Sequence, residues 1–178
     1  MNNTDETMPE KRLQSIRLLL LDVDGVLTDG AIAYTEDRTE TKVFNVKDGL
    51  GIRMLSQNGI ETGIVTGRAS SALLRRSREL GIGRVYDNVG DKGAVFETIL
   101  AETGCEAAAI AFMGDDLPDL ALFGKVGVSI AVADAHEAVR DRADMITAAA
   151  GGRGAVREVC EQILKARGLW EGQLQKWM

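Results

Sequence analysis

Two aspartates, Asp22 and Asp24, follow directly after a run of four leucines at residues 18–21. Such a run is typical of a strand that is buried on both faces. Residues i and i+2 of an extended chain point to the same side, so both carboxylates can act on one ligand. Charges at the end of a buried strand are costly unless they bind a cation or take part in chemistry. The pair is therefore the first candidate for a functional site.

Three further polar motifs follow in chain order, which disfavours a simple solvated turn after the first strand. Thr66-Gly67-Arg68 follows the second apolar stretch, and Gly114-Asp115-Asp116, with Asp119, follows the third. Lys92 lies between these two motifs, at the start of a predicted helix. The carboxyl ends of parallel strands meet at one edge of a sheet, where open α/β sheets bind ligands. The sequence therefore predicts one site that contains several carboxylates, a hydroxyl and a lysine.

These residue types favour phosphoryl chemistry. Carboxylates that repel one another at one place call for a hard cation, and ligands that are all oxygen favour Mg²⁺. Such a site, with a lysine and a threonine hydroxyl, is suited to a phosphoryl group. One carboxylate can attack phosphorus and form an aspartyl-phosphate. The second can protonate the leaving oxygen and then activate water.

The elements that must position these residues alternate between strand and helix. This alternation predicts a doubly wound, mostly parallel, Rossmann-like α/β sheet with helices on both faces. Strands are expected at 18–21, 60–65, 84–86, 107–113, 126–130 and 145–146, and helices at 49–58, 70–80, 91–102, 117–123, 135–142 and 155–167. Two β-prone runs around a polar turn, at about residues 30–46, predict a β-hairpin that projects from the sheet.

One domain, residues 16–168, is expected between a flexible N-terminal tail (residues 1–15) and a C-terminal tail (residues 169–178). No apolar run approaches the roughly 18 residues of a membrane span, and the first dozen residues have no signal-peptide core. These features predict a cytoplasmic protein without a membrane partner.

Composition narrows the function classes. The formal net charge is −6 and aromatic residues make up 4% of the chain, which argues against nucleic acid as a partner. Cys105 and Cys160 form no C-x-x-C pair and are expected to be reduced thiols. The single histidine, His136, cannot build a histidine-rich zinc site, and we assign it a structural place in a loop or at a helix start.

The four motifs, in this order, resemble those of the haloacid dehalogenase superfamily of phosphatases. The matching residues are Asp22, Asp24 and Val26; Thr66; Lys92; and Gly114, Asp115, Asp116 and Asp119. The resemblance implies that Asp22 is the nucleophile and Asp24 the acid and base, with Thr66 and Lys92 as further catalytic residues. It also implies a Mg²⁺ ion whose ligands are Asp22, the carbonyl of Asp24, and Asp115. Asp116 and Asp119 are then expected to support that ligand shell.

Spacing leaves no room for a cap domain between the motifs. From about Ile16 to Leu164, the chain resembles the 3-deoxy-D-manno-octulosonate 8-phosphate phosphatase family. The matching stretches are 44–49, 66–68, 114–120, 131–136 and 151–158. This resemblance implies hydrolysis of that sugar acid phosphate to the free acid and phosphate, in lipopolysaccharide precursor biosynthesis. It also implies a homotetramer whose hairpins assemble centrally and whose neighbouring subunits close the site.

Four residues are expected to bind the substrate: Gly67, Arg68, Arg76 and Lys47. Arg68 directly follows the second motif, and Arg76 lies about two helical turns further on. An arginine can bind a carboxylate through paired hydrogen bonds. Lys47 stands where the family has arginine, so it keeps the charge but not the paired geometry. Solvated helix charges are the alternative for Arg68 and Arg76.

Two rival functions remain to be weighed. A sister phosphatase that acts on a nine-carbon keto sugar acid 9-phosphate resembles this chain in every catalytic motif. That group has glutamate after Thr-Gly, so Arg68 favours the eight-carbon substrate. A phospho-aspartate receiver module also combines acidic residues, a hydroxyl and a lysine, but in another order and without G-D-D-x-x-D.

Overall fold

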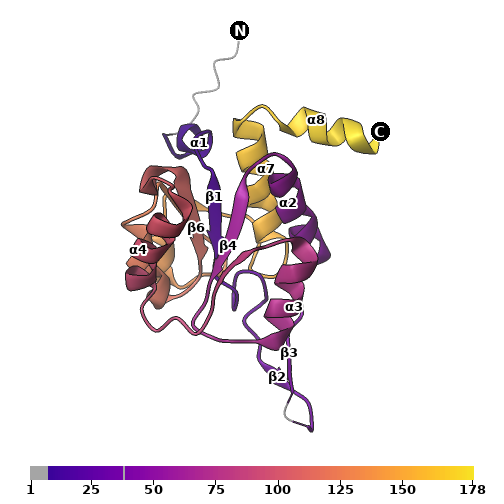
Figure 1. Cartoon of the computed structure of the whole chain (residues 1–178), viewed down its shortest axis with the longest axis vertical. Coiled ribbons are helices and arrows are strands. Elements are labelled where there is room, and N and C mark those ends of the chain that lie inside the picture. The colour runs from indigo at the N-terminus through magenta and orange to yellow at the C-terminus, as the bar shows by residue number, and fades with distance from the viewer. Residues whose placement is uncertain (1–7, 38) are drawn as a thin grey trace.

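A six-stranded parallel sheet forms the centre of the molecule (Figure 1). The structure, a computed structural model, describes residues 8–37 and 39–178. The strand order is β5-β4-β1-β6-β7-β8. The strands are β1 (Leu18–Leu21), β4 (Glu61–Val65), β5 (Arg84–Tyr86), β6 (Ile110–Gly114), β7 (Val128–Ala131) and β8 (Met145–Ile146). The predicted doubly wound α/β fold is confirmed.

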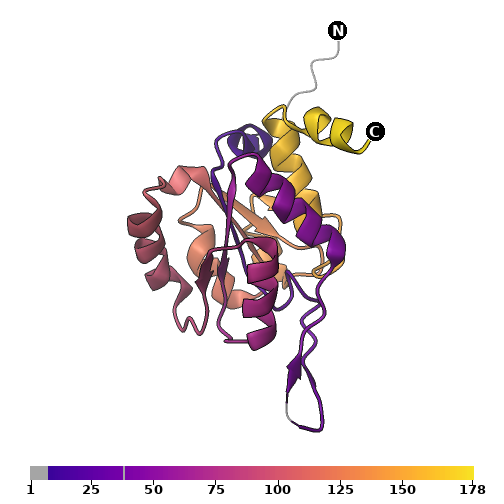
Figure 2. The ribbon, with the colours of Figure 1, turned by 45° about the vertical axis from the view of Figure 1, so that its right-hand side comes forward.

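Helices cover both faces of this sheet (Figures 1 and 2). The α-helices are α1 (Met8–Leu13), α2 (Val46–Gln57), α3 (Ser71–Leu80), α4 (Lys92–Thr103), α5 (Leu120–Phe123), α6 (Glu137–Arg140), α7 (Ala155–Ala166) and α8 (Trp170–Leu174). Three 3₁₀ turns are η1 (Ala107–Ala109), η2 (Leu117–Asp119) and η3 (Gln175–Trp177). Helices α2 and α7 pack against each other on one side of the sheet, and α4 lies on the other.

Strand β1 is the core of the sheet, and its four leucines are all buried. It lies between β4 and β6, so both of its edges are paired, and helices cover both faces of the sheet. Its register aligns Leu21 with Ile64 of β4 and with Met113 of β6. The polar motifs that follow these three strands therefore emerge side by side.

A short hairpin, β2 (Ala33–Tyr34) and β3 (Glu40–Thr41), projects from the body of the molecule (Figure 2). Its antiparallel pairing confirms the predicted hairpin, although the regular ladder spans only two residues on each strand. It lies at the end of the molecule opposite α1 and α8 (Figure 1). Asn45 then caps α2, since its side chain accepts a hydrogen bond from the amide of Lys47 at 2.8 Å.

The N-terminal segment differs from the prediction of a flexible tail through residue 15. Residues 8–13 form α1, and Leu13 is buried in the core. Arg12 donates to the carbonyl of Gly127 at 2.7 Å and pairs with Asp144. These contacts attach the segment to the β7 side of the sheet. Residues 1–7 lie outside the described part of the chain.

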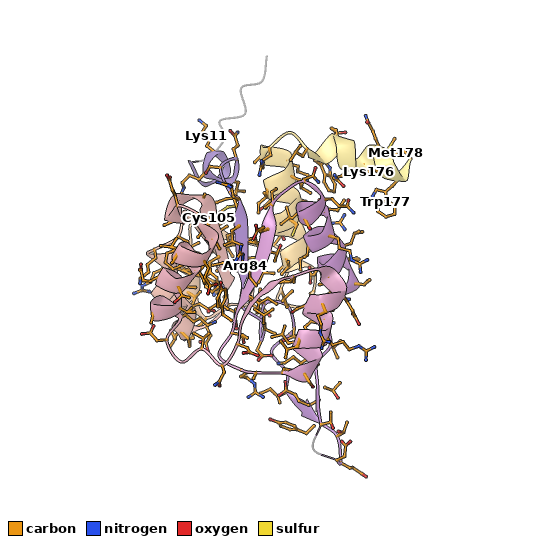
Figure 3. All side chains as sticks on the ribbon, viewed as in Figure 1. Lys11, Arg84, Cys105, Lys176, Trp177 and Met178 are labelled. Carbon is orange, nitrogen blue, oxygen red and sulfur yellow. The ribbon has the colours of Figure 1, made fainter. Side chains whose placement is uncertain are left out.

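The C-terminal segment 169–178 is helical rather than a plain tail. The indole ring of Trp170 on α8 lies under the cationic groups of Arg157 and Lys165 on α7, at 5.9 and 5.2 Å. Trp177 and Met178 extend from the far end of this segment (Figure 3). The segment therefore packs at the end of the molecule away from the hairpin.

Smaller predictions are also settled. The helix expected at 117–123 is divided into η2 and α5, because Asp116 and Asp119 form a capping box around the first turn.

His136 caps α6, where its Nδ1 accepts from the amide of Ala138 at 3.1 Å, so the structural place assigned to it is confirmed. Both cysteines are free thiols. Within residues 8–37 and 39–178, no helix is long and apolar enough to cross a membrane.

Candidate active site

A cavity of about 440 Å³ opens at the carboxyl edge of β1, β4 and β6. It is lined by residues of all four predicted motifs: Asp22, Asp24, Thr66, Gly67, Arg68, Lys92, Asp115, Asp116 and Asp119. A second cavity of about 430 Å³ lies at the amino ends of β4 and β5. Its two charged side chains, Glu61 and Arg84, already pair with each other at 2.8 Å. The first cavity is therefore the candidate active site.

Lys92 is the central cation of this site. Its Nζ lies 2.8 Å from Asp22 Oδ1 and 2.6 Å from Asp119 Oδ1, and all three side chains are buried. Burial alone would lower the pKa of Lys92, but the charges of Asp22 and Asp119 outweigh it and raise the pKa. The lysine therefore carries a positive charge at the base of the site.

Asp119 holds the fourth motif, residues 114–119, in shape. Its Oδ2 accepts from the amides of Asp115 and Asp116 at 2.7 and 3.2 Å, while its Oδ1 binds Lys92. A Cβ atom at Gly114 would lie 2.5 Å from the Asp119 carboxyl group, so only glycine fits there. Both oxygens of Asp119 are thus occupied within the protein, as expected of a residue that supports the metal ligands.

Asp115 has no comparable partner. Its Oδ1 is buried and accepts no hydrogen bond from the described residues. Burial, followed by the charges of Asp22, Asp119 and Asp116, raises the pKa of Asp115 to about 8. Gly25, with φ at +92°, lets the backbone pass this carboxyl group, because a Cβ there would lie 2.1 Å from Asp115 Oδ2.

The acidic cluster fits a divalent cation. Oxygens of Asp22, Asp115 and Asp119 all lie within 4.8 Å of one another. Burial is also the main cause that raises the pKa of Asp22 to about 6, despite its pair with Lys92. A hard cation would reduce the repulsion between these carboxylates and would give the buried Asp115 Oδ1 a partner. We therefore take Asp22 and Asp115 as the side chains that would hold Mg²⁺, which would supply positive charge beside a bound phosphoryl group.

Asp24 faces a different set of charges. Its Oδ1 forms a close ion pair with Lys42, and its Oδ2 lies 3.6 Å from Arg68 Nε. Neither Lys42 nor its neighbour Glu40 was predicted as a site residue. A signal was available in the sequence, because Glu40 begins β3 and Lys42 directly follows it. These two polar residues are at positions i and i+2, and so point to one side of the hairpin.

The structure separates the four predicted substrate-binding residues into two groups. Gly67 and Arg68 line the cavity beside Thr66, whose side chain is buried. Lys47 is exposed near the start of α2, outside the cavity lining. Arg76 also lies outside it, and pairs with Glu79 of its own helix at 3.4 Å. Only the first two are therefore brought to the site within one chain.

Comparisons with known proteins agree with this geometry. The sequence profile of the haloacid dehalogenase-like hydrolase family matches residues 82–158. The 3-deoxy-D-manno-octulosonate 8-phosphate phosphatase of Yersinia pestis is 44% identical over 91% of this chain and 87% of its own. The Escherichia coli K12 phosphatase of the same name is 46% identical over 88% of this chain and 84% of its own.

Solved structures give the same result. The Moraxella catarrhalis phosphatase of that name, crystallised with a magnesium ion, a phosphate ion and a KDO molecule, is 41% identical. It superimposes with a TM-score of 0.93, over 97% of this chain and 100% of its own. The sheet and its carboxylate edge thus define a hydrolase of the haloacid dehalogenase-like class. Within that class, the chain belongs to the 3-deoxy-D-manno-octulosonate 8-phosphate phosphatase family.

Mg²⁺ is predicted to stabilise the folded protein, most strongly at alkaline pH. Folding raises the pKa of Asp115 from 3.8 to about 8, so the folded state holds this proton more tightly than the unfolded chain. The contribution of Asp115 to stability therefore falls as the pH rises through this range. At pH 8 and a hundredfold excess over its dissociation constant, Mg²⁺ should add about 2.7 kcal/mol, or roughly 5–10 °C in Tm.

Calorimetry of Asp115→Asn checks this assignment. The variant should melt at a higher temperature than the metal-free parent at pH 8, and should lose the shift with Mg²⁺. Asp141→Asn, at an exposed position after α6, is the matched control and should keep the shift. A full Mg²⁺ shift in Asp115→Asn would contradict the role of Asp115 as a ligand.

Proposed function

We propose that this protein is a Mg²⁺-dependent phosphomonoester hydrolase that converts 3-deoxy-D-manno-octulosonate 8-phosphate to the free sugar acid and phosphate. The observation that carries the proposal is the placement of Asp22 and Asp24 at one cavity, where Lys92 and Asp115 both lie close to Asp22. The relatives of the same family are named for this reaction. The cytoplasm is the proposed location.

The proposed reaction has two steps. Asp22 attacks phosphorus, and the bond to the sugar oxygen breaks as Asp24 gives that oxygen a proton. Asp24 then takes a proton from water, which attacks the aspartyl-phosphate and restores Asp22. Lys92 orients Asp22 through its 2.8 Å contact, and Thr66 presents its hydroxyl and nearby amides to the phosphoryl oxygens.

Substrate choice is assigned to a second cation of the cavity. A 2-keto sugar acid carries a carboxylate far from its phosphate, so recognition needs a cation apart from Lys92. Arg68 is that cation in our proposal, since it lines the cavity and its side chain is 42% exposed. Arg76 and Lys47 lie outside the cavity, so a substrate role for either requires a second subunit.

We further propose a homotetramer whose neighbours cover this open site. The hairpin and the start of α2 expose four large apolar side chains: Ile32, Tyr34, Val43 and Val46. Two of them, Val43 and Val46, are more than three-quarters exposed. Apolar side chains gathered on a projecting element are typical of a subunit interface. The alternative, that they only cover the hairpin itself, is disfavoured by this exposure.

A nine-carbon keto sugar acid 9-phosphate is the second candidate substrate. It shares the keto acid and the phosphate, so the catalytic residues would serve it equally. The position of Arg68 at the cavity favours the eight-carbon acid, as does the identity of the relatives. A receiver module is disfavoured by the family assignment and by the G-D-D-x-x-D motif at residues 114–119.

Asp22→Asn is predicted to abolish turnover, because an amide cannot form the aspartyl-phosphate. Asp24→Asn should slow turnover about 10²- to 10⁴-fold, the usual contribution of general acid–base catalysis. Released phosphate from p-nitrophenyl phosphate, measured with and without chelator, checks both variants. The matched control is Asp141→Asn. Near-normal turnover by Asp22→Asn would contradict the mechanism.

Arg68→Ala is predicted to raise the Michaelis constant for the sugar acid phosphate about 10- to 30-fold. A partly exposed charge pair contributes less than the 2–5 kcal/mol of a closed one, and 1.4 kcal/mol is tenfold. The constant for p-nitrophenyl phosphate, which has no carboxylate, should change about twofold or less. Arg75→Ala, at a largely exposed arginine of α3, is the control. Equal losses on both substrates would place Arg68 with the phosphate instead.

Val43→Asp is predicted to break the tetramer, because it buries four charges at an apolar interface. Sedimentation velocity at micromolar concentration should show a tetramer for the parent protein and smaller species for the variant. Ile146→Asp, which charges an exposed apolar residue outside the hairpin, should remain tetrameric. A monomeric parent would contradict the proposed assembly.

A further inference from the structure

Four charged side chains form a closed ring beside the catalytic cavity. Arg68 Nη2 lies 2.6 Å from Glu40 Oε2, and Glu40 Oε1 lies 3.1 Å from Lys42 Nζ. Lys42 then forms a close ion pair with Asp24, which completes the ring at 3.6 Å from Arg68. Two positive and two negative charges alternate around it, so every member has opposite charges on both sides.

Lys42 sits behind Asp24 rather than in the cavity. Its side chain is only 2% exposed, and it is not among the residues that line the cavity. A buried ammonium group is costly unless it is paired, and the partners here are Asp24 and Glu40. Lys42 therefore has no surface on which to bind substrate, and its effect on the reaction must pass through Asp24.

The geometry of Asp24 shows what such an effect would be. The terminal torsion of an aspartate is soft, so its carboxyl group rotates readily unless its oxygens are held. Lys42 contacts Oδ1 and Arg68 contacts Oδ2, each from a different direction. By contrast, the side chain that pairs with Asp22 is Lys92, at 2.8 Å. Each of the two carboxylates thus has a separate lysine.

We propose that Lys42 is a positioning residue that fixes the Asp24 carboxyl group for proton transfer, and that Glu40 links it to Arg68. This inference rests on the proposed role of Asp24 as acid and base. It assigns the hairpin a part in the chemistry of its own subunit, in addition to any part in assembly. Hydrogen bonds from Arg68 and then Lys42 lower the pKa of Glu40, which keeps this link charged.

A double-mutant cycle tests the inference on the full-length protein with Mg²⁺. Lys42→Met should lower kcat for p-nitrophenyl phosphate about 10- to 100-fold, a part of the 10²- to 10⁴-fold that acid–base catalysis contributes. The Michaelis constant should change about twofold or less, because Lys42 does not touch the substrate. In an Asp24→Asn background, Lys42→Met should have almost no further effect, since its target is gone.

Two further variants keep the result interpretable. Lys165→Met removes a lysine from α7, where it packs on Trp170 at the other end of the molecule, and should leave kcat unchanged. Lys42→Gln keeps a hydrogen-bond donor without the charge, and should give a kcat between those of Lys42→Met and the parent. It also carries the cycle if thermal unfolding shows that Lys42→Met does not fold.

The outcomes distinguish a failure of the proposed mechanism from a failure of the positioning role of Lys42. If Asp24→Asn alone leaves kcat unchanged, the proposed mechanism itself is wrong. If Asp24→Asn lowers kcat but Lys42→Met does not, the positioning role is wrong. It is also wrong if Lys42→Met lowers kcat by the same factor in the Asp24→Asn background as in the parent. A rise in the Michaelis constant without a loss of kcat would also overturn it.

Discussion

The concentration of negative charge at one edge of the sheet is the constraint on which the site depends. Asp22, Asp115 and Asp119 bring oxygens within 4.8 Å of one another in a largely buried setting. Lys92 offsets part of this charge through its contacts with Asp22 and Asp119. Among the residues that the structure describes, none donates to the buried Asp115 Oδ1, so this edge of the sheet has a place for a divalent cation.

Close packing makes this arrangement possible. Strand β1 carries no charge along its length, so the polar residues begin only where its cover by helices ends. Its parallel register with β4 and β6 brings three strand ends together without any long connection. Gly25 and Gly114 then leave space for the carboxyl groups of Asp115 and Asp119. The backbone thus supplies the proximity that catalysis requires.

The hairpin carries both exposed apolar side chains and charged ones. The side chains of Tyr34 and Val43 are largely exposed and suit contact with other subunits. Its polar residues Glu40 and Lys42 turn toward the cavity and pair with Arg68 and Asp24. Because the domain has no cap, this short element is what connects the Asp24 carboxylate to the surface that we expect to assemble.

The sequence alone determined the α/β class, the strand order along the chain and the four motifs, because buried apolar runs and the acidic residues that follow them are local patterns. It also placed the hairpin, but it treated residues 8–13 as a flexible tail, since the contacts of Arg12 with Gly127 and Asp144 span more than a hundred positions. Only the tertiary structure decided which charges meet. It placed Lys42 on Asp24 and left Arg76 outside the cavity, because ion pairs between distant segments depend on side-chain direction and burial rather than on spacing.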